Sequence, residues 1–205
     1  MNASSLLLAG VDALGVCLDS RQIKQLVSFV QLIQKWNKAY NLVGVSDTHT
    51  LVKKHLLDSL AIVSYIDQSS VLDVGSGAGL PGIPLAIARP DLSFTLLDSI
   101  GKKARFMRQV VIELKLSNVM VEQQRIEKYS SVPKPKIVLS RAFAPLEDAL
   151  KLLSVHCASK GQVKIMLGTK PPQIPEVSDL TNIQSHEIVV PDLNSRRHLL
   201  VATKL

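Results

Sequence analysis

Aromatic residues and cysteines are scarce in this chain of 205 residues. Phe, Trp and Tyr make up only 4% of it, whereas hydrophobic residues as a class make up 46%, so aliphatic side chains must build the core. The two cysteines, Cys17 and Cys157, lie far apart among apolar residues, which predicts buried thiols and excludes a disulfide framework. Their spacing does not suit a metal either, so we expect no metal site.

The chain also lacks a long apolar run. No stretch approaches the roughly 20 residues that a membrane-spanning helix needs. The apolar segment from Ser4 to Leu8 is too short for the core of a signal peptide, and no basic residue precedes it. We therefore expect a cytoplasmic protein that has no membrane partner.

Acidic residues are outnumbered by basic ones. The 24 Lys and Arg residues against 17 Asp and Glu give a formal charge of +7. A cationic surface favours a polyanionic partner such as RNA or DNA, although composition alone also fits a generically basic protein. The positive residues are dispersed in sequence, so only the fold decides whether several of them share one face.

The first third of the chain is predicted to be helical. Apolar residues recur at steps of three and four between Ser20 and Tyr40, which predicts one face of a helix that Asp19 or Ser20 caps. A second helix is expected to start after Ser46 or Asp47 and to run to about Ile66. We interpret residues 1–67 as an N-terminal helical cap and residues 68–205 as the core, together one compact unit.

Strands and helices alternate in the core. The expected strands are Val71–Gly75, Ser93–Asp98, Asn118–Gln123, Lys136–Ser140, Gln162–Leu167, Ile183–Val190 and His198–Thr203. The expected helices are Leu80–Ala88, Lys102–Leu116 and about Pro145 to Cys157. Repeated strand–helix units predict an α/β fold with a mostly parallel sheet and helices on both faces. The last two strands have no helix between them and predict an antiparallel hairpin.

The segment Val71–Gly82 is the most informative of the chain. It reads as an apolar strand, three glycines at alternate positions and a helix start, which together form a cradle for a nucleotide. A dinucleotide fingerprint would need a third glycine where Leu80 stands. The pattern Asp73-x-Gly75-x-Gly77-x-Gly79 instead resembles the first motif of class I S-adenosylmethionine (AdoMet) methyltransferases. A glycine-rich turn without a ligand is the less favoured alternative.

Asp98 ends the second expected strand. Ligands of open α/β sheets lie beyond the carboxyl ends of the strands, where an acid accepts hydrogen bonds from both ribose hydroxyls. Such an acid also occurs in NAD enzymes, so it discriminates weakly. We favour ligand contact over the alternative of a surface Asp that caps the following helix.

Three further segments carry candidate side chains. Arg125-Ile126-Glu127 follows the third strand, beside the adenine ring in methyltransferases, although alone it reads as an ordinary turn. Arg141 ends the fourth strand and either contacts the base or the cofactor carboxylate or forms a plain ion pair with a core acid; its sequence context favours neither. His55 and Asp58 lie on one helical face, and we interpret this pair as structural rather than as a catalytic dyad.

Five segments in one order point to a particular family: Trp36–Leu42, Lys54–Ser59, the glycine loop through Pro84, Leu96–Ser99 with Lys102 and Lys103, and Ser140–Ala144. Together they resemble the bacterial small-subunit (16S) ribosomal RNA guanine-N7 methyltransferases, also called glucose-inhibited division protein B. The resemblance runs from about Ser20 to Lys204. The Gly-Leu-Pro-Gly-Ile-Pro and Ser-Arg-Ala-Phe runs are its most specific parts.

The resemblance implies AdoMet as cofactor and 16S rRNA, or the small ribosomal subunit, as partner. The implied cofactor-binding residues are Asp73, Gly75, Gly77, Leu80, Asp98, Ile126, Glu127 and Arg141. The implied RNA-binding residues are Arg125, Arg141, Lys164, Lys170 and Arg197. One departure matters: the family usually has a Lys after the fifth strand where this chain has Gly168, so either Lys170 replaces it or that RNA contact is lost.

The implied reaction needs no general base, because guanine N7 carries a free lone pair and no proton. We therefore expect no catalytic residue, apart from a positioning role for Arg141. Two alternatives stay open: another class I methyltransferase that acts on a small molecule or a protein, and a non-catalytic RNA-binding protein with an AdoMet fold. A NAD-dependent oxidoreductase is disfavoured by Leu80.

Overall fold

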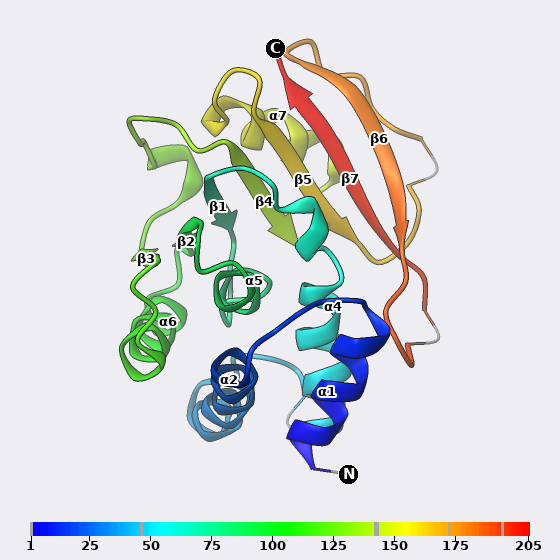
Figure 1. Cartoon of the computed structure of the whole chain (residues 1–205). Helices are drawn as coiled ribbons and strands as arrows, with labels where there is room; N and C mark the ends of the chain where they lie inside the picture. The colour runs from blue at the N-terminus through cyan, green and yellow to red at the C-terminus, as the bar shows by residue number, and fades with distance from the viewer. Residues whose placement is uncertain (1, 46, 142–143, 172, 194) are drawn as a thin grey trace.

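A mixed sheet forms the centre of the computed structural model, which describes residues 2–205 except 46, 142–143, 172 and 194 (Figure 1). Its strands are β1 (Ser70–Val74), β2 (Ser93–Leu97), β3 (Val119–Glu122), β4 (Ile137–Arg141), β5 (Gln162–Leu167), β6 (Leu180–Ile188) and β7 (Arg197–Lys204). They lie in the order β3-β2-β1-β4-β5-β7-β6. The first five are parallel, and β7 runs antiparallel to both β5 and β6. This arrangement confirms the expected fold class.

The strand order reverses at β1. The chain runs outward from β1 to β2 and β3, then crosses to β4 on the other side, where Val74 pairs with Ser140. Crevices open at such switch points, beyond the carboxyl ends of the two diverging strands. Gly75 and Arg141 therefore belong to one crevice although 66 positions separate Val74 from Ser140.

Helices cover both faces of the sheet, as expected. Successive strand residues point to opposite faces, so Val71 joins the core under α5 (Gly82–Ala88) and α6 (Gly101–Leu114). Leu72 joins the second core under α7 (Leu146–His156). Figure 1 shows α7 behind β4 and β5, and α5, α6 and α2 on the side that faces the viewer. Cys157 is buried in the second core as predicted, but Cys17 is exposed, so that prediction was wrong.

The long cap helix has the predicted bounds. α2 covers Ser20–Tyr40. Asp19 Oδ1 accepts a hydrogen bond from the backbone N of Gln22 at 2.7 Å, and the backbone N of Asp19 donates one to Gln22 Oε1 at 2.8 Å. This reciprocal cap fixes the start of the helix. α1 (Ala3–Ala13) precedes it and contacts it, and Leu6 and Leu7 of α1 are buried in the same core.

The next helical stretch is irregular, which the sequence analysis missed. Asp47 caps α3 (Thr48–Leu51) as expected, while Ser46, the other expected start, lies outside the described residues. A π-helical segment, η1 (Val52–Leu57), follows and leads into α4 (Asp58–Leu60) and a 3₁₀ turn, η2 (Val63–Tyr65). π-helical turns are rare and frequent at functional sites, so this segment stands out before any ligand is considered.

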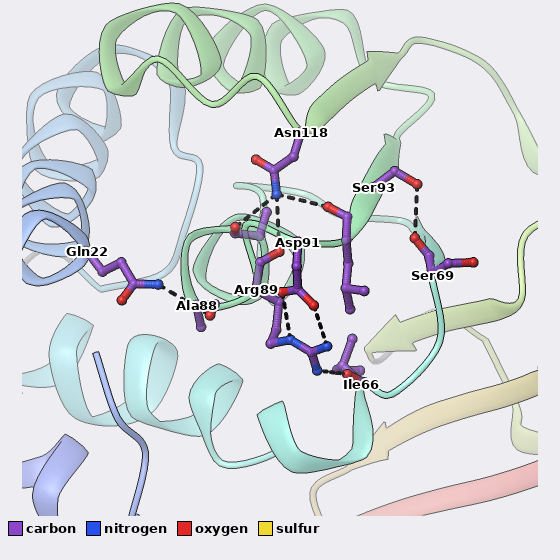
Figure 2. Close-up of polar contacts among 10 residues, drawn as sticks. Gln22, Ile66, Ser69, Ala88, Arg89, Asp91, Ser93 and Asn118 are labelled. Atoms are coloured by element: carbon purple, nitrogen blue, oxygen red, sulfur yellow. Dashed lines mark hydrogen bonds and ion pairs between the residues drawn. The ribbon is translucent and has the colours of Figure 1, made fainter. Parts of the chain in front are cut away.

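Side chains tie the cap to the core around the end of α5 (Figure 2). Gln22 donates to the Ile87 carbonyl at 2.8 Å, which joins α2 to α5. Arg89 donates to the carbonyl of Ile66 and pairs with Asp91 at 2.8 Å. The Asn118 amide, at the entrance to β3, donates to three carbonyls of the α5–β2 connection. The bonds to Ala86, Ile87 and Arg89 satisfy carbonyl groups at the carboxyl end of α5 that the helix itself leaves free.

Candidate functional site

The glycine loop between β1 and α5 bends the chain through a backbone region that favours glycine. Gly75, Gly77 and Gly79 have φ values of 71°, 59° and 78°. At Gly79 an added Cβ would lie 2.3 Å from Ile83 Cδ1, so packing requires glycine there. At Gly77 an added Cβ would meet no atom closer than 3.9 Å. Packing within the protein therefore does not account for Gly77, whereas its positive φ does favour glycine.

Asp73 lies below this loop and is fully buried. Its Oδ2 accepts a hydrogen bond from Gly82 N at 3.0 Å, whereas its Oδ1 has no partner among the described residues. Burial raises the pKa of Asp73 to about 6, an effect that the Gly82 amide and the charge of Arg141 offset in part. A buried carboxylate with an unsatisfied oxygen favours a positive charge nearby, and AdoMet is a cation.

A first hollow, the glycine-loop pocket, has a volume of about 290 Å³. It is lined by Val74, Gly75, Leu97, Asp98, Ser99, Ile100, Lys103, Gln124, Arg125, Ile126 and Glu127. Ile126 and Glu127 come from the 3₁₀ turn η3 (Ile126–Lys128), which follows β3. Carboxyl-end loops of β1, β2 and β3 thus meet here. Among the predicted cofactor residues, the structure brings together Gly75, Asp98, Ile126 and Glu127.

Asp98 fixes the shape of the glycine-loop pocket. Its Oδ2 accepts from Gly77 N at 2.9 Å and its Oδ1 from Ile100 N at 2.9 Å, and only 6% of the residue is exposed. The two readings of Asp98 therefore do not exclude each other. The carboxylate accepts hydrogen bonds from both the glycine loop and the start of α6, and it also lines the glycine-loop pocket.

A second hollow, the arginine cleft, opens on the other side of β1 and has a volume of about 400 Å³. Its lining comes from η1, from α4 and the turn after it, from the carboxyl ends of β4, β5 and β6, and from the start of β7: Lys54, His55, Asp58, Ile62, Arg141, Met166, Leu167, Gly168, Ile188, Arg197 and His198. Figure 1 shows α4 close to the arrowheads of β4 and β5. Arg141 lines this cleft and is not part of the glycine-loop pocket lining.

Asp58 binds both arginines of the arginine cleft. Its Oδ1 lies 3.0 Å from Arg197 Nε and its Oδ2 lies 3.4 Å from Arg141 Nη1. The core acid that the sequence analysis considered for Arg141 is therefore present. Sequence reasoning paired Asp58 with His55 instead. The spacing along one helix suggested that partner, and nothing local points to residues 83 and 139 positions further along the chain.

His55 is held in the neutral form. Burial, together with the nearby charges of Arg141 and Lys54, lowers its pKa to about 4. Its Nδ1 and that of His198 are buried, and neither has a hydrogen-bond partner among the described residues. Since Arg141 affects the pKa of both His55 and Asp73, it lies within electrostatic reach of both sides of the crevice. His198 carried no signal in the sequence analysis.

Lys164, which the sequence analysis expected among the RNA-binding residues, is buried in this structure. The residue is 2% exposed, and its ammonium group donates to the Tyr65 carbonyl and lies 3.5 Å from Asp67 Oδ1. Burial lowers the pKa of Lys164. Residue alternation in β5 turns this side chain toward η2, so it pins the cap to the sheet.

Lys170 occupies a different position from Lys164. It is exposed and lines a neighbouring hollow of about 570 Å³ that shares Gly168 and His198 with the arginine cleft. The structure thus brings Arg141 and Arg197 together, puts Lys170 next to them and leaves Arg125 at the glycine-loop pocket. Ala142 and Phe143, part of the family segment after β4, lie outside the described residues.

Within the described part of the chain, no three His, Cys, Asp or Glu residues lie close enough together to hold a metal ion. In that same part, no helix has the length and apolar character to span a membrane.

Comparison with known proteins decides the family. The profile of a family described as rRNA small subunit methyltransferase G matches residues 22–199. The chain belongs to this family. A ribosomal RNA small subunit methyltransferase G from Alteromonas mediterranea is 48% identical over 198 residues, covering 96% of this chain and 94% of the relative. The protein of that name from Salmonella arizonae is 44% identical, with 93% of each chain covered.

Solved structures confirm the class I methyltransferase fold at low sequence identity. The magnesium protoporphyrin IX methyltransferase from Synechocystis, solved with bound AdoMet, superposes with a TM-score of 0.60 at 13% identity, covering 92% of this chain and 99% of that one. The tRNA (m1A58) methyltransferase from Aquifex aeolicus gives 0.55 at 14% identity, covering 73% and 68%.

Proposed function

We propose that this chain transfers a methyl group from AdoMet to N7 of a guanine in 16S rRNA of the small ribosomal subunit, in the cytoplasm. The observation that carries the proposal is the pair of hollows on either side of the β1–β4 switch point, one with Gly75, Asp98 and Glu127 in its lining and the other with Arg141 and Arg197. Membership of the rRNA small subunit methyltransferase G family supports the RNA as substrate.

The glycine-loop pocket fits AdoMet. The residues that would hold it are Asp98 at the ribose, Ile126 and Glu127 at the adenine, and the Gly75–Gly79 backbone at the methionine part. When bound, AdoMet supplies a methyl group that its sulfonium charge activates for displacement. Asp73 favours that positive charge through its buried carboxylate, and Leu80 closes the loop from the core side.

The protein's task is to orient the guanine. Guanine N7 has an in-plane lone pair and no proton at neutral pH, so no side chain has to act as a base. Holding nucleophile and methyl group in line at about 3 Å supplies on the order of 7–11 kcal/mol of the barrier. An arginine that bound N7 would block the reaction, so a productive contact from Arg141 goes to O6 or to a phosphate.

Incubation with radiolabelled AdoMet and unmethylated bacterial small subunits tests this proposal. We expect label in 16S rRNA at one guanine, and mass spectrometry of the digested RNA should identify N7-methylguanosine. A protein whose glycine-loop pocket is disabled by Asp98→Ala provides the negative control. Label on ribosomal protein, on a different atom or on no macromolecule would contradict the proposal.

A further inference from the structure

In the arginine cleft, the single carboxylate of Asp58 holds both arginines. Contact with RNA by itself does not explain this acid. Asp58 comes from α4, Arg141 from the end of β4 and Arg197 from the start of β7. The side chain of Asp58 is 6% exposed, and those of Arg141 and Arg197 are 24% and 22% exposed. The acid is therefore buried beneath two arginines that each keep an accessible part.

The contacts leave hydrogen-bond donors free. Arg197 uses Nε for Asp58 and Nη1 for Ser195 Oγ and the Arg196 carbonyl. Arg141 uses only Nη1 for Asp58. Nη2 of each arginine therefore has no hydrogen-bond partner among the described residues. Guanidinium groups with free, fixed donors match the geometry of a phosphate better than mobile ones, because less side-chain freedom is lost on binding.

The charges and walls of the cleft indicate the ligand class. Lys54, Arg141 and Arg197 line it against Asp58, which leaves an excess of two positive charges apart from the two histidines. The remaining wall is apolar, with Ile62, Met166, Leu167 and Ile188. A ligand with an anionic end and a flat ring whose faces pack on apolar side chains fits such a lining. A single nucleotide of RNA has both parts.

We propose that Asp58 is a positioning residue, which presets Arg141 and Arg197 as a clamp for a phosphate of the nucleotide that enters the arginine cleft. The proposal rests on the proposed function, since it names where that RNA is gripped. Asp58 itself touches neither RNA nor cofactor; it acts through the two arginines. Its negative charge lowers the net positive charge of the cleft by one, and its carboxylate fixes the two guanidinium groups in position.

Whether Asp58→Asn strengthens or weakens RNA binding distinguishes a positioning role of Asp58 from a purely electrostatic effect of its charge. Asp58→Asn removes a negative charge near RNA, so by Coulomb attraction alone it would strengthen RNA binding. If Asp58 sets the clamp, the same change weakens binding by about tenfold, the equivalent of one charge-assisted hydrogen bond, and lowers the kcat of methylation. Asp58→Glu keeps the charge and should recover part of both losses.

The experiment measures RNA affinity by fluorescence anisotropy, AdoMet affinity by calorimetry, and kcat and KM on small subunits. Asp192→Asn is the matched control, because it makes the same charge change at an exposed carboxylate that pairs with Lys53 at 3.0 Å outside the cleft lining. We expect this control to behave as the unmodified protein. Adding Asp58→Asn to Arg141→Gln/Arg197→Gln should cause no further loss, because the groups through which it acts are gone.

Three results would overturn the clamp. The first is Asp58→Asn binding RNA as tightly as the Asp192→Asn control or more tightly. The second is an Asp58 effect that persists undiminished without the arginines. The third is a loss of AdoMet affinity with RNA affinity unchanged, which would mean that the arginines hold the cofactor's carboxylate. If Asp58→Asn does not fold in thermal unfolding, Asp58→Glu decides by the same three readings.

Failure of the proposed function looks different. In that case the unmodified protein labels no 16S rRNA, while the anisotropy and calorimetry readings still decide whether Asp58 presets a phosphate clamp.

Discussion

The glycine-loop pocket and the arginine cleft lie on either side of the same strand end and are built in different ways. The pocket is made mostly of three short runs of residues that follow β1, β2 and β3, and its key carboxylate, Asp98, is fixed by two backbone amides. The cleft is made of long side chains from elements far apart in sequence, held by ion pairs with Asp58. The comparison teaches that a site shaped by backbone groups can be predicted from the spacing of residues along the chain. A site made of side chains from distant elements can be predicted only once the fold is known.

The largest expected effect tests the backbone-built side. Gly77→Val should lower AdoMet affinity by more than about a hundredfold, roughly 3 kcal/mol, because the added side chain enters space that the protein leaves open for the ligand. RNA affinity should change little. Calorimetry and anisotropy measure the two.

Gly15→Val is the control for Gly77→Val. Gly15 also has a positive φ, 65°, and no atom lies within 4 Å of an added Cβ, so the backbone strain is matched far from the site. Equal loss of AdoMet binding in both variants would show that strain, and not the ligand space above Gly77, is responsible.

The next effect concerns Lys164, the buried lysine of β5. Lys164→Gln should lower the free energy of unfolding by about 1–3 kcal/mol, because the Tyr65 carbonyl loses its buried donor. That corresponds to a melting temperature lower by roughly 2–10 °C. RNA affinity at a temperature where the variant is folded should stay unchanged. A selective loss of RNA affinity without a loss of stability would restore Lys164 as an RNA ligand.

Asp73→Asn should stabilise the ligand-free protein. The pKa of Asp73 is raised from 3.8 to about 6, so the folded state binds more protons than the unfolded state between these values, and stability from this group falls as pH rises from about 4 to 6. Above pH 6 the penalty is complete, on the order of 2–3 kcal/mol, and the substitution removes it. Urea unfolding at pH 5 and pH 7.5 measures it.

AdoMet binding should respond to Asp73→Asn in the opposite sense. The unmodified protein should lose AdoMet affinity below about pH 6 as Asp73 becomes neutral, and the variant should bind weakly at either pH. A variant that is less stable at pH 7.5, or that binds AdoMet with the original pH dependence, contradicts the role assigned to this carboxylate.

Local sequence patterns gave most of the fold and most of the pocket. The bounds of α2 and β5 were predicted residue for residue, because periodicity and caps are local. The π-helical segment η1 was missed, since its apolar spacing resembles that of an ordinary helix. The burial of the Lys164 side chain was also missed. Which face of the sheet a strand residue points to depends on how the strands pair, and the sequence alone does not show that pairing.

The smallest expected effect concerns Lys170 and the family's missing lysine. Lys170→Ala should weaken binding to small subunits severalfold and reduce the slope of log affinity against log salt by about 1, as expected for one phosphate contact. Gly168→Lys should restore the loss, because no atom lies within 4 Å of a Cβ added at Gly168. Methylation at the original rate by Lys170→Ala would mean that Lys170 does not replace that lysine.

The central claim is that cofactor and RNA are held on opposite sides of the β1–β4 switch point. The most direct test measures AdoMet and RNA affinity for both Asp98→Ala and Arg197→Gln. The account predicts a crossed result: Asp98→Ala weakens AdoMet by on the order of 2–4 kcal/mol and leaves RNA binding intact, while Arg197→Gln does the reverse. Loss of AdoMet affinity in Arg197→Gln, or loss of RNA affinity alone in Asp98→Ala, would contradict it.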